Sequence, residues 1–328
     1  MMVISHREVS RLVQGQEAAV IEAVADGYRA HALGRTTVPH SVFLRFPNDE
    51  RNRIIALPAY LDGRRDVAGV KWISSFPGNV EIGRPRASAV VVLNSLEDGR
   101  PECLLEGSII SSSRTAASAA LAARELTPEN CSSVSLIGCG PIAYEIVRYL
   151  QIVRPGIKSV VLHDLDERRA GLLAERCAAE WSGLDLTVVR TLPVALAAAD
   201  LVVFATTAAR PYTGLADCRP GTTVLHVSLR DVAVDAIVRN VNVVDDADHV
   251  CRANTSLHLA EERTGGRGFI AASIGDLLRG GKPPEPGSKL TIFSPFGLGI
   301  LDLAVADLVR RRAEEQDLGT TVPDFCPS

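Results

Sequence analysis

The feature that most constrains the fold is a short glycine-containing segment, Gly138-Cys139-Gly140-Pro141-Ile142-Ala143. It follows the apolar run 133–137, which is typical of a buried strand, and it opens a helical pattern over 141–152. In such a strand–turn–helix unit the first glycine permits the tight turn, and the second lets the backbone approach a pyrophosphate. The GxGxxA spacing therefore predicts a dinucleotide-binding turn at the N-terminus of a helix.

The residues around this turn continue the same alternation of strand and helix. Further strands are predicted at 159–163, 186–190, 201–205, 222–228 and 241–244, with another helix over 166–181. The connecting segments are short, as βαβ units require. Aromatic residues make up only 5% of the chain, which suits helices packed closely on both faces of a parallel sheet. We therefore predict an α/β fold whose residues 116–298 form a doubly wound Rossmann domain.

An acidic residue at the end of the second strand bears on the choice of cofactor. Asp164 follows the strand 159–163 directly, and Asp166 comes two residues later. A carboxylate there accepts hydrogen bonds from the ribose hydroxyls and repels a 2′-phosphate, so the sequence favours NAD over NADP. The alternative interpretation is that the glycines only tighten a βα turn and that Asp164 caps the helix.

Residues 1–115 have a different pattern, which predicts an α+β domain with a mostly antiparallel sheet. A helix is expected over 16–33, followed by strands at 41–46, 53–57, 67–76 and 88–93. The C-terminal segment 298–315 again has a helical pattern, and such a last helix commonly packs on the first domain. We therefore assign residues 1–115, completed by the helix 299–316, to a substrate-binding and dimerisation domain. The tail after Gln316 is expected to be loose.

Three basic residues of the first domain lie among apolar or small residues. Arg45 lies in SVFLRF, Lys71 in GVKWISSFPGN and Arg114 in SSSRTAASAA. Such cations are costly to bury without an anionic partner, and a substrate carboxylate would supply one. Lys71 could instead transfer a proton near the reacting carbon. An ion pair or an edge-strand charge is the alternative for each of them. Arg114 is predicted to begin an Ala-rich helix at the seam between the domains.

A second group of candidates follows the strand around Val224. Asp231 lies at the presumed carboxyl end of this strand, the ligand-binding edge of an open α/β sheet, where it could act as a general base. A helix cap is the alternative, and His226 is expected to be structural. Asp245, Asp246 and Asp248 lack the glycine and the distal glutamate of a calcium loop, so we expect a solvated turn and no metal site.

Composition excludes several classes of function. The formal net charge is −4 and no basic block stands out, which argues against nucleic acid as a partner. No apolar run approaches the roughly 18 residues of a transmembrane helix, and the N-terminus lacks the layout of a secretory signal. The seven cysteines form no CxxC pair, which predicts reduced thiols in a cytoplasmic protein.

Several of these segments together resemble the ornithine cyclodeaminase/μ-crystallin family. They are GVKWISSFPGN, EGSIISSSRTAASAALAAREL, LIGCGPIA, SLRD and NVVDDADHV, and the similarity runs over roughly residues 40–310. Within the family, ISSFPGN and SSSRTAA look most similar to the branch that oxidises N-(2-amino-2-carboxyethyl)-L-glutamate for siderophores and peptide antibiotics. Ornithine cyclodeaminases carry a Gly-Asp-Cys-Pro-Gly-Lys type of segment where this chain has Ser228-Leu229-Arg230-Asp231, which argues against ornithine.

The resemblance implies roles for individual residues. Arg45, Lys71 and Arg114 would bind substrate carboxylates, and Asp231, with Lys71, would transfer protons. The NAD-binding set would comprise Thr115, Gly138, Gly140, Pro141, Ile142, Asp164, Ser228 and Ser294. The resemblance also implies a homodimer and a pathway partner of the PLP-dependent, cysteine-synthase-like type.

The implied reaction is the NAD-dependent oxidative cleavage of N-(2-amino-2-carboxyethyl)-L-glutamate to L-2,3-diaminopropionate and 2-oxoglutarate. Related chemistry on another amine is the first alternative: ornithine or lysine cyclodeamination, alanine dehydrogenation or ketimine reduction. A non-catalytic protein that binds NADH or a small molecule, as μ-crystallins can, is the second. A regulatory role for a bound ligand also stays open.

Overall fold

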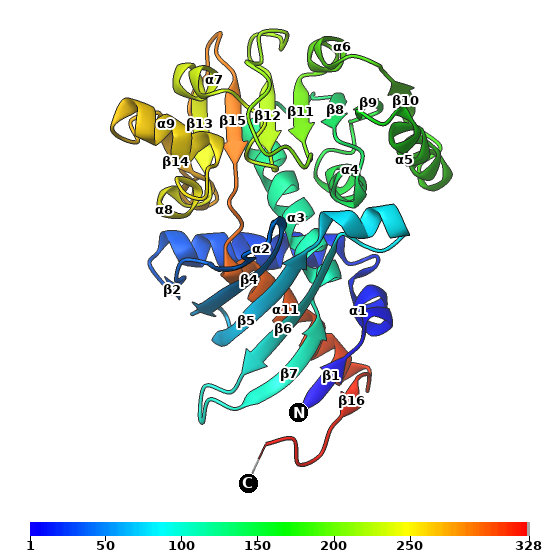
Figure 1. Cartoon of the computed structure of the whole chain (residues 1–328), viewed down its shortest axis with the longest axis vertical. Helices are drawn as coiled ribbons and strands as arrows, with labels where there is room; N and C mark the ends of the chain where they lie inside the picture. The colour runs from blue at the N-terminus through cyan, green and yellow to red at the C-terminus, as the bar shows by residue number, and fades with distance from the viewer. Residues whose placement is uncertain (327–328) are drawn as a thin grey trace. The chain divides into compact units, whose positions relative to one another are not determined.

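The computed structural model describes residues 1–326, apart from the side chain of Glu50, and the chain forms two compact units. Unit 1 comprises residues 1–114 together with the C-terminal segment from Gly297, and unit 2 comprises residues 115–296. Figure 1 shows the elements of both units along the chain. The helix α3 (Ser108–Leu126) contributes residues to each unit.

Unit 1 is built on an eight-stranded, mostly antiparallel sheet. Its strands are β1 (Met2–Ile4), β2 (Thr36–Thr37), β3 (Val42–Phe46), β4 (Asp49–Leu61), β5 (Val67–Ser75), β6 (Ala87–Asn94), β7 (Pro101–Glu106) and β16 (Thr320–Thr321). The order is β16-β1-β7-β6-β5-β4-β2, with β3 paired to β4, and only β1 and β7 run parallel. The predicted antiparallel strands are therefore present, whereas β1, β2, β7 and β16 were not predicted.

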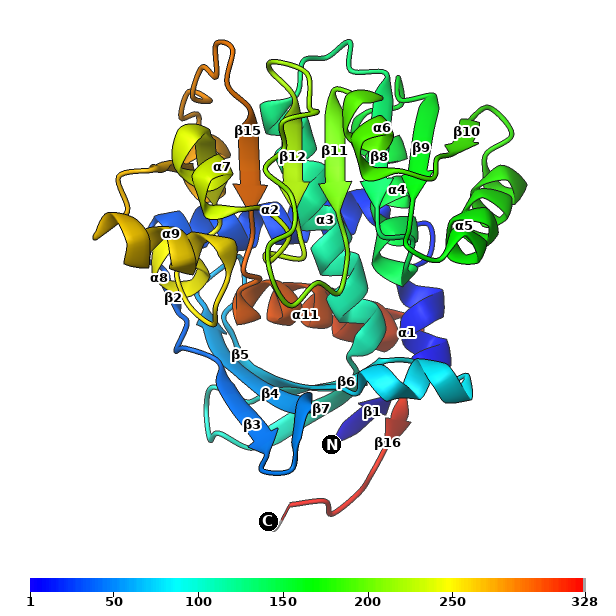
Figure 2. The same cartoon turned by 45° about the horizontal axis from the view of Figure 1, so that its top comes forward.

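Four helical elements belong wholly to unit 1. They are α1 (His6–Val13), α2 (Glu17–Ala32), the 3-10 helix η1 (Pro77–Ile82) and α11 (Gly299–Glu315). The helix α11 packs on β4, β5, β6 and α2 (Figure 2). Its predicted apolar stripe, Leu301, Val305 and Val309, is buried. The segment after α11 was expected to be loose, but Thr320 and Thr321 pair with Val3 and Met2 and so extend the sheet.

Unit 2 is a parallel sheet between helices. Its strands are β8 (Ser133–Ile137), β9 (Ser159–His163), β10 (Asp185–Val188), β11 (Leu201–Phe204), β12 (Thr223–His226), β13 (Val241–Val244), β14 (Ile270–Ser273) and β15 (Thr291–Ser294). Their order is β10-β9-β8-β11-β12-β15-β13-β14, and every pairing is parallel. The order reverses between β8 and β11, which is the doubly wound Rossmann arrangement that the sequence predicts.

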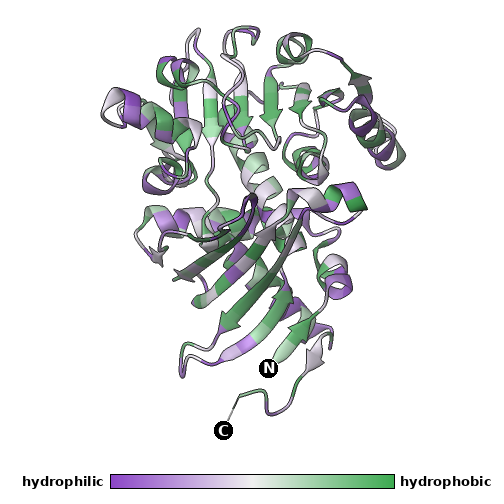
Figure 3. Cartoon of the chain, in the orientation of Figure 1, coloured by the Kyte–Doolittle hydropathy of each residue, from purple (hydrophilic) through white to green (hydrophobic). Residues whose placement is uncertain are grey.

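The helices of unit 2 are α4 (Pro141–Val153), α5 (Glu167–Glu180), α6 (Leu192–Ala197), α7 (Val234–Arg239), α8 (Ala247–Val250), α9 (Ser256–Thr264) and α10 (Ile274–Leu277). The sequence predicted α4 and α5 but not the shorter helices. Strands β11 and β12 are buried at every position and predominantly apolar, as strands covered on both faces must be (Figure 3). Burial of these strands provides the core of the unit.

The start of α3 differs from the prediction. The helix was expected to begin at Arg114, but it begins six residues earlier at Ser108. The carboxylate of Glu106 accepts hydrogen bonds from the backbone N–H of Ser108 at 2.7 Å and of Ile109 at 3.2 Å. These bonds satisfy free donors of the first turn and carry the helix through the serine-rich segment. Arg114 therefore lies within the helix.

Candidate active site

The glycine turn lies where β8 passes into α4. Gly138 has a φ of +91°, and a Cβ there would lie 2.7 Å from the carbonyl oxygen of Ala205, so only glycine fits. Gly140 is the N-cap of α4, and a Cβ built on it would have no atom within 4 Å. Open space thus lies in front of a helix N-terminus, where Pro141 and Ile142 form the first turn. This arrangement fits the pyrophosphate of a dinucleotide.

Asp164, the acidic residue expected beside the glycine turn, lies where the sequence predicted. Asp164 follows β9, and its Oδ2 accepts the backbone N–H of Cys139 at 2.7 Å. Its Oδ1 accepts the backbone N–H of Asp166 at 2.9 Å, while Asp166 caps α5 by accepting from the backbone N–H of Arg168. The helix-capping role considered for Asp164 therefore belongs to Asp166. Gly138 and Asp164 lie together at the carboxyl edge of the sheet, beside the reversal of strand order, where ligands of such sheets bind.

A second polar cluster of unit 2 surrounds Asp231, five residues beyond the end of β12. Its fully buried carboxylate accepts hydrogen bonds from the hydroxyls of Ser228 at 2.5 Å and Tyr212 at 3.1 Å, and from Thr206. His226 Nε2 accepts the backbone N–H of Asp231 at 3.1 Å and lies 3.3 Å from Oδ2. Several donors therefore converge on one carboxylate.

These contacts set the charge of Asp231. Burial raises the pKa of this carboxyl group, but His226 and the hydroxyls of Ser228 and Thr206 outweigh it, and the pKa falls below its ordinary value. Asp231 is therefore an ionised carboxylate at neutral pH. His226 Nδ1 lies 3.3 Å from the hydroxyl of Ser294, so Ser228 and Ser294 both connect to this cluster.

Two of the predicted cations of unit 1 bind a buried carboxylate that was not predicted from the sequence. Asp302 on α11 is fully buried, and its Oδ2 accepts from Lys71 Nζ at 2.7 Å. Its Oδ1 accepts from Arg114 Nε at 3.1 Å. Lys71 Nζ also donates to the hydroxyl of Ser111 at 3.2 Å. Three elements, β5, α3 and α11, thus bring two cations onto one carboxylate.

Lys71 is the most perturbed amine of this cluster. Its side chain is 2% exposed, and its pKa is lowered from 10.5 to about 8. Burial is the largest cause and repulsion from Arg114 adds to it, whereas Asp302 opposes both by attraction and by its hydrogen bond. An amine with this pKa exchanges a proton readily near neutral pH, as a group in acid–base catalysis must.

The structure brings together two of the three predicted cations of unit 1. Lys71 and Arg114 share Asp302, but Arg45 lies exposed on β3, with its guanidinium 5.6 Å from the ring centre of Phe43. Arg45 forms no ion pair with any side chain that the structure describes. Its neighbour across the strands is Arg53, which sequence reasoning also missed. Thr206 and Tyr212 were missed as well, because they lie in a loop without a motif.

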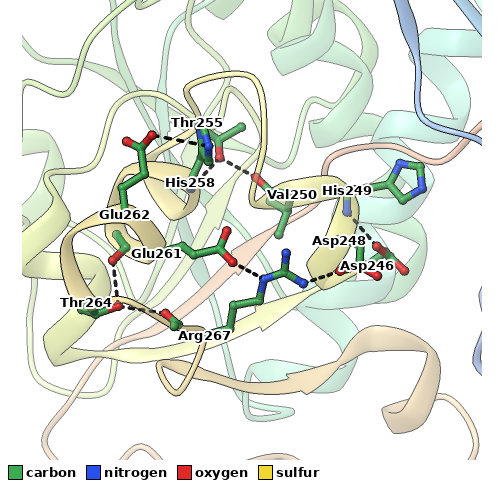
Figure 4. Close-up of polar contacts among 12 residues, drawn as sticks. Asp246, Asp248, His249, Val250, Thr255, His258, Glu261, Glu262, Thr264 and Arg267 are labelled. Carbon is green, nitrogen blue, oxygen red and sulfur yellow. Dashed lines mark hydrogen bonds and ion pairs between the residues drawn. The ribbon is translucent and has the colours of Figure 1, made fainter.

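The acidic group around Asp246 forms helix ends and ion pairs. Asp246 caps α8 by accepting the backbone N–H of His249 at 2.8 Å, and Asp248 pairs with Arg267, which also binds Glu261 (Figure 4). Asp245 accepts the backbone N–H of Phe296 at 2.9 Å. Residues 1–326 contain no group of three or more His, Cys, Asp or Glu side chains that could hold a metal ion.

The structure also bears on the predictions for the cysteines and for membrane-spanning helices. The seven cysteines are free, and burial raises the pKa of the Cys103 and Cys139 thiols to about 12. In the described part of the chain, no helix has the length and apolar character needed to cross a membrane.

The family model of the ornithine cyclodeaminase/mu-crystallin family matches residues 1–317. The chain belongs to this family. The family and the fold inferred from the glycine turn, the Lys71 segment and the Asp231 segment are therefore confirmed.

Two curated relatives span almost the whole chain. An alanine dehydrogenase of Archaeoglobus fulgidus is 30% identical over 330 residues, which cover 99% of this chain and 98% of the relative. An N-((2S)-2-amino-2-carboxyethyl)-L-glutamate dehydrogenase of Staphylococcus aureus is 25% identical over 331 residues, which cover 98% of each protein. The relatives therefore share one architecture and differ in the amine they are named for.

Solved structures agree with this assignment. The Δ1-pyrroline-2-carboxylate reductase of Thermococcus litoralis, in complex with NADH and L-proline, has a TM-score of 0.91 and 25% identity. The alignment covers 98% of this chain and all of that one. An archaeal alanine dehydrogenase dimer with bound NAD has a TM-score of 0.89 and 28% identity, with 99% of both chains covered.

Proposed function

We propose that this protein is an NAD-dependent oxidoreductase that acts on the carbon–nitrogen bond of N-(2-amino-2-carboxyethyl)-L-glutamate and releases L-2,3-diaminopropionate and 2-oxoglutarate. The observation that carries the substrate assignment is the excess of cations in unit 1. Lys71 and Arg114 share a single carboxylate, Asp302, and Arg45 forms no ion pair with a described side chain, so the three cations exceed their anionic partners. A substrate with three carboxylates would balance this charge better than alanine or proline, which have one.

The coarser part of the proposal, an NAD-dependent oxidoreductase of amino acids, rests on the family and its relatives. The relatives are named as dehydrogenases and reductases, and two related structures hold NAD or NADH. In this chain Gly138, Gly140 and the first turn of α4 would hold the pyrophosphate, and Asp164 would bind the ribose. Thr115, Ser228 and Ser294 would complete the cofactor site.

The charges of unit 1 and unit 2 suggest how protons move. When bound, NAD would supply the acceptor for the hydride that leaves the glutamyl α-carbon of the substrate. Lys71, with a pKa of about 8, would take the proton of the substrate ammonium, so that the amine is neutral before oxidation. Asp231, which is ionised, would take a proton from the water that adds to the resulting imine carbon. Cleavage of the carbon–nitrogen bond then releases the two products.

The test is a panel of amines with the purified protein and NAD. The proposal predicts NADH and equal amounts of 2-oxoglutarate and L-2,3-diaminopropionate from the aminocarboxyethyl-glutamate, and no NADH from ornithine. Ammonia and proline from ornithine would overturn it in favour of a cyclodeaminase. The absence of NADH with every amine would favour a binding protein.

Alanine dehydrogenation is the second candidate, because the Archaeoglobus fulgidus relative is 30% identical over nearly the whole chain. The products distinguish the two candidate reactions, since alanine would yield pyruvate and ammonia, whereas the aminocarboxyethyl-glutamate would yield 2-oxoglutarate and L-2,3-diaminopropionate. A higher kcat/KM with alanine than with the aminocarboxyethyl-glutamate would favour this candidate.

We also propose a homodimer formed through the outer face of the unit 1 sheet. Cross-strand neighbours lie on one face, and Val42, Ala56, Trp72 and Val90 are such neighbours on adjacent strands. Val42 is 64%, Trp72 44% and Val90 37% exposed, so this face presents large apolar side chains to its surroundings. The related alanine dehydrogenase structure is a dimer. Light scattering of Trp72→Arg tests the proposal, which predicts a monomer for the variant and a dimer for the wild type.

Two further points complete the proposal. The reduced thiols favour a cytoplasmic enzyme. A PLP-dependent enzyme of the cysteine-synthase type would supply the substrate by joining a three-carbon amino acid to glutamate.

A further inference from the structure

A cluster of three arginines lies at one end of the unit 1 sheet, apart from the Lys71–Asp302–Arg114 group. Arg45 on β3 lies directly opposite Arg53 on β4, and Arg53 lies opposite Ser75 at the end of β5. Figure 2 shows strands β3, β4 and β5 in this sheet. Arg86 directly precedes β6, and its carbonyl oxygen accepts the backbone N–H of Phe76 at 2.8 Å. We call Arg45, Arg53, Arg86 and Ser75 the arginine cluster.

The cluster holds buried polar atoms without partners. The Nε atoms of Arg53 and Arg86 and the hydroxyl oxygen of Ser75 are buried and form no hydrogen bond to the atoms that the structure describes. Ser75 is only 9% exposed. Buried donors in native proteins are nearly always satisfied, so three neighbouring ones without partners indicate a group that binds there.

The charges of the cluster point to an anion. Burial lowers the pKa of Arg53, and repulsion from Arg45 lowers it further; Arg86 is affected by burial and by Arg53 in the same way. Among the described residues none of the three arginines forms an ion pair. Asp49, in the same hairpin, accepts hydrogen bonds from the backbone N–H of Arg51 and Asn52 instead. An added anion would relieve this repulsion.

Ser75 of the arginine cluster lies on the same face of the sheet as Lys71, the residue proposed to transfer a proton. Side chains alternate along a strand, so Ser75 and Lys71, four residues apart on β5, lie on the same face, with their Cα atoms roughly 13 Å apart. Guanidinium groups bind carboxylates with two parallel hydrogen bonds, and a serine hydroxyl can add a third donor. One molecule with a carboxylate at each end can therefore contact both the arginine cluster and the Lys71–Asp302–Arg114 group.

We propose that the arginine cluster is a carboxylate-binding subsite that selects substrates with a distal carboxylate over those that carry only one. This inference rests on the proposed function, because it assigns the side-chain carboxylate of the glutamyl half to the cluster. It also explains how a chain 30% identical to an alanine dehydrogenase would act on a different amine.

Two 2-oxo acids test the subsite without catalysis. 2-Oxoglutarate is pyruvate with one methyl hydrogen replaced by a CH2COO⁻ group, so their dissociation constants, measured by calorimetry at equal ionic strength, report on that group. We expect wild-type protein to bind 2-oxoglutarate at least tenfold more tightly than pyruvate. The double variant Arg53→Gln/Arg86→Gln should bind both equally. Arg84→Gln, an exposed arginine two residues from Arg86, is the matched control and should keep the preference.

The melting temperature separates a binding role from a structural one. If the cluster binds an anion, the double variant is at least as stable as wild type without ligand, and 2-oxoglutarate raises the melting temperature of wild type alone. If the double variant does not fold, Arg53→Lys, which keeps the charge but loses the bidentate geometry, should show a reduced preference for 2-oxoglutarate.

The outcomes distinguish this inference from the proposed function. A preference for 2-oxoglutarate that persists in the double variant, or that wild type lacks, would overturn the subsite. If the aminocarboxyethyl-glutamate gave no NADH while the preference for 2-oxoglutarate depended on the arginines, the proposed reaction would fail and the subsite would stand.

Discussion

Replacing Asp302 by Asn tests the contact that sets the charge of Lys71. The two groups are 2.7 Å apart and buried, and Asp302 is the main influence that raises the pKa of Lys71 against burial. In the variant, burial and repulsion from Arg114 remain without the opposing attraction. One adjacent opposite charge changes a pKa by about 1–3, so the pKa of Lys71 should fall from about 8 to between about 5 and 7.

The assay is the pH dependence of kcat/KM, which reports the ionisation of the free enzyme. Wild type should show an inflection near pH 8, and Asp302→Asn should show it at lower pH. The inflection moves to lower pH whether the neutral or the protonated amine of Lys71 is the active form, because both forms depend on the same pKa. Only the slope of the profile through the inflection differs between these cases.

Asp307→Asn is the matched control for this variant. Asp307 lies on the same helix and is also buried, but it pairs with Arg310 and Arg311. Its replacement should leave the inflection near pH 8. An inflection that stays in place in Asp302→Asn, or that moves to higher pH, would refute the assigned role of Asp302.

Three further predictions concern the other candidate residues. Arg114→Ala should raise the KM for the amine at least tenfold and leave the KM for NAD unchanged; steady-state kinetics with each substrate varied would contradict this if the KM for the amine were unaltered. Asp231→Asn should lower kcat by about 10²–10⁴ while NADH binding, followed by fluorescence, is retained; full activity would exclude Asp231 as the proton acceptor. Gly140→Ala should weaken NAD binding with little loss of melting temperature, because the added Cβ has no protein atom within 4 Å; unchanged affinity would place the pyrophosphate elsewhere.

The fold of unit 2 could be predicted because its signal is local. Short apolar strands, short connections and the GxGxxA spacing all indicate the same parallel sheet, and β8, β9 and α4 lie within a residue of their predicted bounds. The start of α3 could not be predicted in this way. It depends on Glu106, which caps the helix from the preceding strand.

The candidate site was predictable only in part. Lys71, Arg114 and Asp231 stood out because charged residues in apolar surroundings are conspicuous. Asp302 did not, although it lies in the apolar segment Leu301–Val305, where a carboxylate is equally conspicuous. Its partner Lys71 is 231 residues away, and only the folded chain shows that the two meet.

The same limit applies to the arginines of unit 1. Arg45 was predicted to join Lys71 and Arg114, but its neighbour is Arg53, because the β3–β4 hairpin pairs these two residues directly. Pro47 and Asn48 between these strands indicate a turn, but they do not determine which residues lie opposite each other, and the register shifts between Arg45 and Phe46.

A competition experiment tests the central claim most directly. Equal concentrations of N-(2-amino-2-carboxyethyl)-L-glutamate and L-alanine are given to the purified protein with limiting NAD, and the 2-oxo acids formed are measured by mass spectrometry. The account predicts that 2-oxoglutarate is formed in large excess over pyruvate. An excess of pyruvate would contradict it and make the protein an alanine dehydrogenase.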